Sequence, residues 1–198
     1  MTQKPFKEND LFKGTPNWSL NACVGDNGGP YDMYDYAQGF LEAARVVIRR
    51  STDDDAIVDT LVYPACFNFR HGIELFIKYG VGSLSEIKNA KIEYSKKHSL
   101  LGDWKIFRAE SVGVFAFDEK DLDIVDKTIA CFEEVDPNGQ IFRYPESIKG
   151  IQHLKEWSLI NLGRVGGALD EIMTVFKGWH FMIEVELEAK WDGASAAE

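Results

Sequence analysis

The chain has 198 residues, of which 45% are hydrophobic and 13% aromatic, a balance typical of a globular protein and too apolar for a disordered one. A net charge of −10 argues against a general nucleic-acid coat protein, because such a protein needs a broadly basic surface. No apolar run approaches the roughly 20 residues of a membrane-spanning helix. The polar start of the chain does not resemble a signal peptide, so we expect a cytoplasmic protein without membrane contact.

The predicted organisation begins with an irregular N-terminal arm over residues 1–30, where the sequence GDNGGP marks a turn. One helical domain is expected over residues 31–190, followed by a flexible tail at 191–198. A first helix is predicted over 32–50, with two arginines at its C-terminal end and an inward apolar stripe. The stripe consists of Tyr36, Phe40, Ala44, Val47 and Ile48.

Residues 63–78, with the sequence YPACFNFRHGIELFIK, are predicted to form the second helix. Pro64 would lie in its first turn, where the missing N–H is not needed, and apolar residues at helical spacing would form its buried side. Beside that side lies a polar group at spacings of three and four residues, whose members can form one connected ladder. They are Arg70, His71, Glu74 and Lys78.

Two interpretations of this ladder are open. The first is an ion-paired helix face that orients the helix, since partly buried charges are normally paired. The second is a polar site, in which Arg70 would hold a phosphate or a carboxylate and His71 would transfer protons. Adjacent residues of a helix point about 100° apart, so these two side chains would reach one substrate from different faces.

Two more helices are predicted in the middle of the chain. A short one covers 99–107, with Ser99 as its N-cap and Trp104 buried. The next begins at residue 118 or 121 and ends at 135, where the sequence DPNG forms a turn.

The remaining sequence predicts one extended piece and one long helix. Residues 140–147 are expected to be extended, because Tyr144 precedes a proline. A long helical pattern then begins near residue 148 or 153. No segment of alternating apolar residues is long enough to predict a sheet, so the expected fold class is all-α, a bundle of about five helices.

The three cysteines lie far apart and lack a C-x-x-C pair, as expected for reduced thiols. Cys66 and Cys131 lie in apolar helical runs and are predicted to be core residues, which leaves Cys23 as the candidate for reactivity. No motif has the spacing of metal ligands or of a nucleotide-binding loop. We therefore predict neither a metal site nor a cofactor.

A local basic patch is predicted between residues 86 and 108, where basic residues outnumber acidic ones. Such a patch can contact RNA phosphates, and an aromatic side chain within it can stack on an unpaired base. The candidate RNA-binding residues are Lys88, Lys91, Lys96, Lys97 and Tyr94.

Several short motifs follow one another along the chain. They are YPACFNFRHGIELFIKYG, HSLLGDW, an acidic helix ending in DPNG, IFRYPES and a closing long helix. In this order, over about residues 32–188, they resemble the bacterial HEPN-like proteins. The resemblance implies an all-helical bundle that commonly dimerises, in a family associated with RNA cleavage, toxin–antitoxin pairs and defence against phage.

Catalytic members of that family carry an Arg followed about four to six residues later by a His, which transfers protons while the Arg stabilises charge on the phosphate. In this chain Arg70 and His71 are adjacent, and none of the four histidines follows an Arg at the family spacing. The candidate catalytic residues are Arg70, His71 and His98. The alternative is a polar network that joins loops to the bundle and consists of Glu74, Lys78, Arg143 and Tyr144.

Two functional hypotheses follow from these residues and from the resemblance. One is a HEPN-like protein of an RNA-targeting, toxin–antitoxin or anti-phage system, acting as a metal-independent endoribonuclease with a non-standard Arg/His site. The other is a non-catalytic helical module that dimerises and binds a protein partner. The expected partners are a second copy of the chain, RNA and a protein encoded in the same operon.

Overall fold

The structure is a computed structural model that describes residues 7–25, 27–28, 31–53, 57–95 and 98–195. The chain divides into two units, Met1–Tyr31 and Asp32–Glu198. Among the described residues of the first unit, the only helix is a single 3-10 turn, Trp18–Leu20, with no buried residue. The second unit carries all five α-helices of the described chain.

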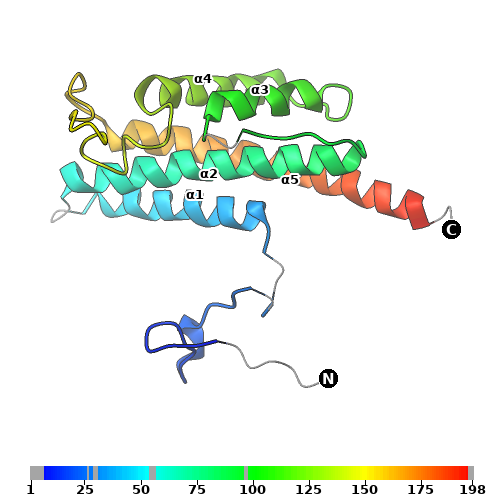
Figure 1. Ribbon diagram of the computed structural model, residues 1–198, viewed down its shortest axis with the longest axis horizontal. Coiled ribbons are helices and arrows are strands. Elements are labelled where there is room, and N and C mark those ends of the chain that lie inside the picture. The colour runs from blue at the N-terminus through cyan, green and yellow to red at the C-terminus, as the bar shows by residue number, and fades with distance from the viewer. Residues whose placement is uncertain (1–6, 26, 29–30, 54–56, 96–97, 196–198) are drawn as a thin grey trace. The chain divides into compact units, whose positions relative to one another are not determined.

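The second unit is a helical bundle, as predicted (Figure 1). Its central helix, α2, contacts α1, α3 and α5, while α4 contacts α3 and α5. The described residues contain no β-strand, only one isolated bridge between Glu146 and Gln152. The helices are α1 (Met33–Arg50), α2 (Val58–Ile87), α3 (Leu100–Ser111), α4 (Glu119–Val135) and α5 (Leu162–Ser195).

Helix α1 begins where the sequence predicts, with Asp32 as its N-cap. The Asp32 carboxylate accepts the backbone N–H of Asp35, and the Asp35 side chain accepts the N–H of Asp32, a capping box. The predicted inward stripe is shifted, because Tyr36 is 61% exposed and Ala37 is buried instead. Small residues explain the shift: a Cβ at Gly72 of α2 would lie 3.2 Å from the carbonyl oxygen of Ala37, so the two backbones approach closely there.

Helix α2 extends beyond both predicted ends and therefore has Pro64 in its interior rather than in its first turn. Proline cannot donate to the carbonyl four residues earlier, that of Thr60. The third helix is also longer than predicted and ends at Ser111. Its predicted N-cap is confirmed, since the Ser99 hydroxyl accepts the N–H of Gly102 at 3.2 Å.

The last helix begins at Leu162, later than the sequence pattern predicts. Turns replace both the expected extended piece at 140–147 and the expected start of the helix. Leu154 has a left-handed backbone, with φ of 55°, which an α-helix does not accommodate. Asn161 caps α5 instead, because its Oδ1 accepts the N–H of Arg164 at 3.0 Å. At its other end α5 continues to Ser195, into the stretch expected to be a tail.

The core is rich in aromatic side chains packed between α2, α3 and α5. Trp104 is buried as predicted, and its ring stacks on that of Trp179 with centroids 5.9 Å apart. Cys66 is buried, whereas Cys131 is exposed, so the prediction that both are core residues is wrong for Cys131. Helical periodicity misplaced this thiol, since the buried face of α4 runs through other positions, such as Ile129.

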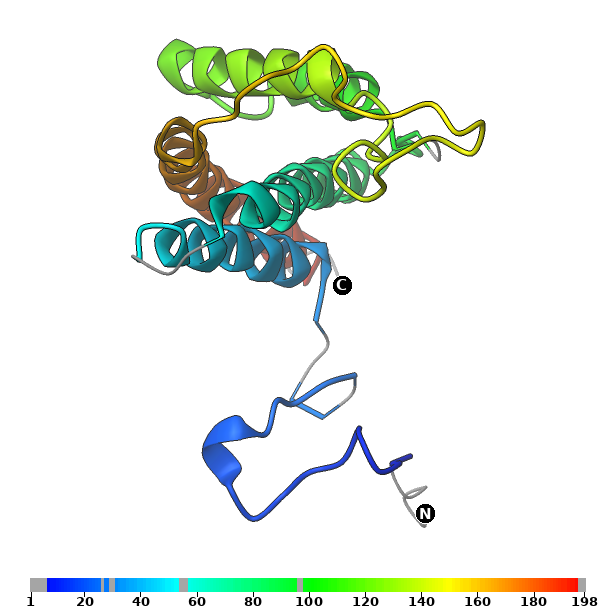
Figure 2. The ribbon, with the colours of Figure 1, turned by 90° about the vertical axis from the view of Figure 1, so that its left-hand side faces the viewer.

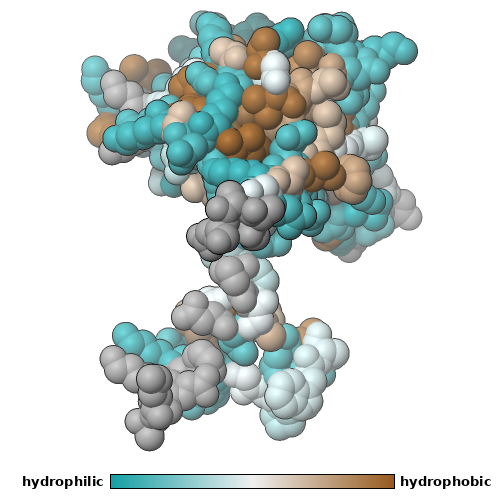
Figure 3. Space-filling view, turned by 90° about the vertical axis from the view of Figure 1, so that its right-hand side faces the viewer, coloured by the Kyte–Doolittle hydropathy of each residue, from teal (hydrophilic) through white to brown (hydrophobic). Residues whose placement is uncertain are grey.

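Apolar side chains also reach the surface. Figure 3 shows a group of them at the end of the bundle where α2 and α3 terminate, surrounded by polar side chains. In the segment after α3, Val112 is 76% exposed. None of the described helices combines the length and the apolar character that crossing a membrane requires.

Two glycines of α2 provide a test of the core. A Cβ at Gly80 would lie 2.3 Å from Cε2 of the buried Phe107, so we expect Gly80→Ala to lower the free energy of unfolding by about 1–3 kcal/mol through overpacking. At Gly82, in the same helix, no atom lies within 4 Å of an added Cβ. Gly82→Ala should therefore stabilise the protein by about 0.5–1 kcal/mol. Urea denaturation of both variants tests this difference, and equal effects would contradict it.

Candidate functional site

Arg70 lies in the middle of α2 and is only 2% exposed. Its Nε donates to the carbonyl oxygen of Asp136 at 2.8 Å, and Nη2 donates to the carbonyls of His98 at 2.9 Å and Pro137 at 3.2 Å. Nη1 donates to Oε2 of Glu74 at 3.2 Å. All three guanidinium nitrogens therefore have protein acceptors. Arg70 joins α2 to the segment before α3 and to the turn after α4.

The turn after α4, predicted from the sequence DPNG, is built to receive this guanidinium. The Asp136 side chain is fully buried and accepts the backbone N–H groups of Gln140 at 2.8 Å and Ile141 at 3.0 Å. Gly139 has a φ of 68°, and a Cβ there would lie 2.7 Å from Nη1 of Arg70. Both the backbone conformation and the lack of space require glycine at this position.

Glu74 is the anion at the centre of the predicted ladder and is 1% exposed. Its Oε1 accepts from Nζ of Lys78 at 2.6 Å and from Nδ1 of His98 at 2.7 Å. Its Oε2 accepts from Arg70 and lies 3.9 Å from Nδ1 of His71. Burial by itself raises the pKa of this carboxyl, but the neighbouring His71, Lys78 and His98 outweigh burial and hold the pKa well below its usual range. Glu74 is therefore ionised at neutral pH.

His98 lies at the edge of this cluster, with 53% of its side chain exposed. An ionised carboxylate only accepts hydrogen bonds, so Nδ1 of His98 must carry the proton that points to Glu74. In the neutral ring, Nε2 is then the unprotonated nitrogen. The His98 backbone is left-handed, with a φ of 56°, and its carbonyl accepts from Arg70. Such a conformation is unusual for a residue other than glycine and is found at functional sites.

His71 takes part in the same cluster from a neighbouring position on α2. Its ring lies parallel to that of Phe67, with centroids 5.6 Å apart, and meets the edge of Phe40 at 4.5 Å. These aromatic contacts fix the orientation of the imidazole, 28% of which is exposed. The geometry therefore brings two oriented imidazoles to one buried carboxylate.

A small cavity of about 150 Å³ opens beside these groups. The predicted catalytic residues all line it, together with Arg143 from the loop after α4. Arg143 is exposed, and its guanidinium lies 5.6 Å from the ring centre of Phe67 and 5.4 Å from that of Tyr144. The lining consists of Phe67, Arg70, His71, Glu74, His98, Gly139 and Arg143.

A larger hollow of about 640 Å³ adjoins this cavity, and Arg143 lines both. Tyr63 is 45% exposed there and Tyr144 48%. His153 also lines the hollow, with its Nδ1 2.8 Å from the carbonyl oxygen of Tyr144. Exposed aromatic rings beside a guanidinium suit an unpaired base next to a phosphate.

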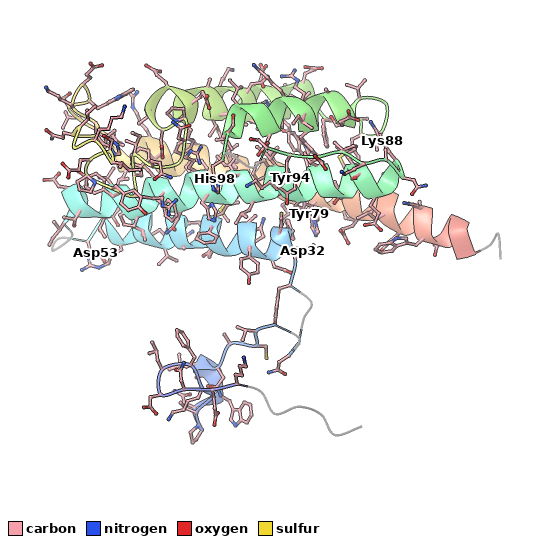
Figure 4. All side chains as sticks on the ribbon, viewed as in Figure 1. Asp32, Asp53, Tyr79, Lys88, Tyr94 and His98 are labelled. Carbon is pink, nitrogen blue, oxygen red and sulfur yellow. The ribbon has the colours of Figure 1, made fainter. Side chains whose placement is uncertain are left out.

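The described lysines of the predicted RNA-binding patch line neither the small cavity nor the larger hollow. Lys88 pairs with Glu110 at 2.8 Å, and Lys91 pairs with Glu93 at 2.6 Å. In Figure 4, Lys88 lies near the end of α2 and His98 nearer its middle. Each of these two lysines is thus paired with a neighbouring acid, and Lys88 lies away from His98.

The other residues of that patch fall into two groups. Lys96 and Lys97 lie outside the described residues. Tyr94 is half-buried, and Nζ of Lys78 lies over its ring at 5.4 Å from the centre. This cation–π contact gives Tyr94 a place at the rim of the polar cluster.

A second polar cluster was not predicted from the sequence. The Tyr79 hydroxyl donates to Oε1 of Glu184 at 2.8 Å and lies 2.9 Å from Nδ1 of His180, whose ring stacks on Tyr34 at 3.5 Å. Burial and the bond to Glu184 raise the pKa of Tyr79, and burial lowers the pKa of His180. Three helices meet in this cluster, so no short motif could reveal it.

A third buried carboxyl, that of Asp103, was also missed in the sequence. Its Oδ1 accepts the backbone N–H of Ser95 at 2.5 Å, and Oδ2 has no hydrogen-bond partner among the described residues. Burial raises the pKa of Asp103. An acidic residue in the first turn of α3 is ordinary in sequence, and only the fold shows that this one is buried.

The chain matches no protein-family model, no curated protein and no solved structure. The resemblance to HEPN-like proteins therefore depends on the order of the short motifs. Within the described parts of the chain, no group of three or more His, Cys, Asp and Glu side chains is arranged to hold a metal ion.

Proposed function

We propose that this chain is a HEPN-like protein that cleaves RNA without a metal ion, with His98 and His71 as its proton-transfer pair. The observation that carries the proposal is that both imidazoles line one cavity beside the Glu74 carboxylate, which accepts from Nδ1 of His98 at 2.7 Å and lies 3.9 Å from Nδ1 of His71. A buried carboxylate that fixes a histidine tautomer is a common device of general acid–base catalysis.

The reaction needs one base and one acid. Nε2 of His98 would take the proton of a ribose 2′-hydroxyl, whose oxygen then attacks the adjacent phosphorus. The bond from phosphorus to the 5′ oxygen breaks, and a protonated His71 would donate a proton to that leaving oxygen. The products are a 2′,3′-cyclic phosphate and a free 5′-hydroxyl.

The two arginines of the cavity have different roles in this proposal. All three guanidinium nitrogens of Arg70 donate to protein acceptors, so Arg70 acts as a positioning residue that holds the backbone of His98. Arg143 is exposed, and no described carboxylate pairs with it, so it is the cation available to the phosphate.

A second candidate function is a non-catalytic module that binds a protein partner. The four hydrogen bonds of Arg70 to the protein favour it, because the residue that resembles the family's catalytic Arg is here engaged in structure. The net charge of −10 also favours a basic protein partner over RNA. This candidate predicts a folded protein that does not cleave RNA.

Cleavage of total RNA in the presence of a chelator tests the first candidate. We expect His98→Asn to reduce the rate at least about 100-fold, because asparagine cannot exchange protons at neutral pH. Asparagine tolerates a left-handed backbone and can still donate to Glu74, so the fold should be retained. The readout is the appearance of 2′,3′-cyclic phosphate ends.

His180→Asn is the matched control, since His180 is a half-buried histidine that lines neither the small cavity nor the hollow beside it. It should retain the rate within a few-fold. Arg143→Gln should slow cleavage and lower the melting temperature by no more than a few degrees, because the cation–π contacts of Arg143 contribute about 1 kcal/mol or less. Absence of cleavage by well-folded wild-type protein would overturn the proposal and favour the binding module.

A further inference from the structure

An apolar groove of about 640 Å³ lies apart from the polar cavity. Side chains of α2, α4, the start of α5 and the segment before α5 form its walls. Figure 2 views the bundle from this end, where α4 passes above α2 and the first turns of α5. The groove has the size of pockets that bind small organic ligands.

The groove results from small side chains at positions where larger ones would fill the interior. Cys66 of α2, Thr128 of α4 and Ala168 of α5 all line it. The groove is open to solvent along one side, so a ligand can enter it from the surface. Two large apolar side chains at the groove, Trp157 and Leu159, are 43% and 90% exposed. A ligand that covered them would gain free energy from the apolar surface that it removes from water.

The charges at the groove are not balanced. Lys127 and Arg164 line it with one acid, Glu171, which gives a local excess of one positive charge in a chain of net charge −10. Lys127 lies 3.8 Å from the carboxylate of Asp123, whereas no described acid forms a salt bridge with Arg164. Arg164 and Glu171 are seven residues apart on α5, which separates them by about 10 Å along the helix.

We propose that the groove binds a linear amphiphile with an anionic head, of the chemical class of medium-chain carboxylates. The carboxylate would pair with the guanidinium of Arg164, and the alkyl chain would lie between α4 and α5 over Ala168. Charge complementarity at one end and an apolar wall along the rest select this class over a neutral or cationic ligand.

The thiol of Cys131 gives a direct readout, because it is exposed and lines the groove. In the full chain carrying Cys23→Ser, alkylation of Cys131 by a maleimide should slow in a saturable manner as decanoate is added below its micellar concentration. In the series octanoate, decanoate and dodecanoate, the Kd should fall about 4-fold for each methylene group that is added to the alkyl chain. Cys66 is an internal control, because burial raises the pKa of its thiol to about 12 and it should stay unlabelled while the protein is folded.

The variant Arg164→Gln distinguishes the contribution of the ligand's carboxylate from that of its alkyl chain. The substitution should raise the Kd for decanoate about 10-fold or more, and it should leave the protection of Cys131 by decanol unchanged. Equal protection by decanoate in both proteins, or no saturable protection in the wild type, would overturn the proposal. A Cys131 thiol that is already protected in a ligand-free dimer would also overturn it, since a second copy of the chain would then occupy the groove.

Discussion

Replacing Arg70 with alanine should lower the free energy of unfolding by about 3–5 kcal/mol, because the change removes one of the two cations that pair with the buried carboxylate of Glu74. It also removes the donors to three backbone carbonyls, those of His98, Asp136 and Pro137. Buried acceptors that lose their donors are costly to leave unsatisfied. Equilibrium denaturation in urea, with the slope compared between proteins, measures the loss.

Arg143→Ala is the matched control for this prediction. Arg143 lines the same cavity but is exposed, and its cation–π contacts with Phe67 and Tyr144 contribute about 1 kcal/mol or less. If Arg70→Ala cost no more than Arg143→Ala, the guanidinium of Arg70 would not be the link between α2 and the two loops. It would then be available to a ligand, and the catalytic role suggested by its sequence position would regain support.

The contacts of this network within α2 could be predicted from the sequence, whereas its contacts with distant segments could not. The spacing of Arg70, Glu74 and Lys78 predicted an i, i+4 ladder, and both of these ion pairs form. The other partners of Arg70 are backbone carbonyls, far along the chain. A carbonyl oxygen has the same chemistry at every residue, so no sequence pattern marks the one that a guanidinium will find.

The helices were predicted more reliably than their ends. The start of α3 was predicted correctly from its N-cap, Ser99, and the start of α1 from its apolar helical spacing. The start of α5 was misplaced because Trp157 and Ile160 continue an apolar helical period through a segment that forms turns and lines the groove. Apolar spacing alone does not distinguish a helix from a loop that covers a hollow.

The network connects stability to the proposed chemistry through His98. A left-handed backbone at a residue other than glycine costs about 1–3 kcal/mol, and it persists only where the surroundings hold it. Arg70 holds the carbonyl of His98, and Glu74 holds its ring. In the proposed reaction, Arg70 and Glu74 would therefore act by positioning, and the half-exposed imidazole of His98 would meet the substrate.

Glu74→Gln should lower the free energy of unfolding by about 3–5 kcal/mol at neutral pH, since Arg70 and Lys78 would lose their shared anion. The difference from wild type should depend on pH. The pKa of Glu74 in the native state lies below the unfolded-state value of about 4.3, so on acidification the unfolded chain binds this proton first. The carboxylate's contribution is therefore fully present above about pH 5 and is lost as the pH falls through the native-state pKa.

Denaturation curves of both proteins between pH 7 and about pH 3 test this, because subtracting one from the other isolates the Glu74 carboxyl from the other acids of the chain. The wild-type advantage should shrink steadily below about pH 4. Glu110→Gln is the control, since Glu110 forms a surface pair with Lys88 and is 40% exposed; its cost should be about 1 kcal/mol or less. A Glu74→Gln difference that stayed constant with pH would show that Glu74 has an ordinary pKa in the native state. His71, Lys78 and His98 would then not favour the ionised form of Glu74 in the native state, and the polar network on which the proposed proton-transfer pair depends would lose its basis.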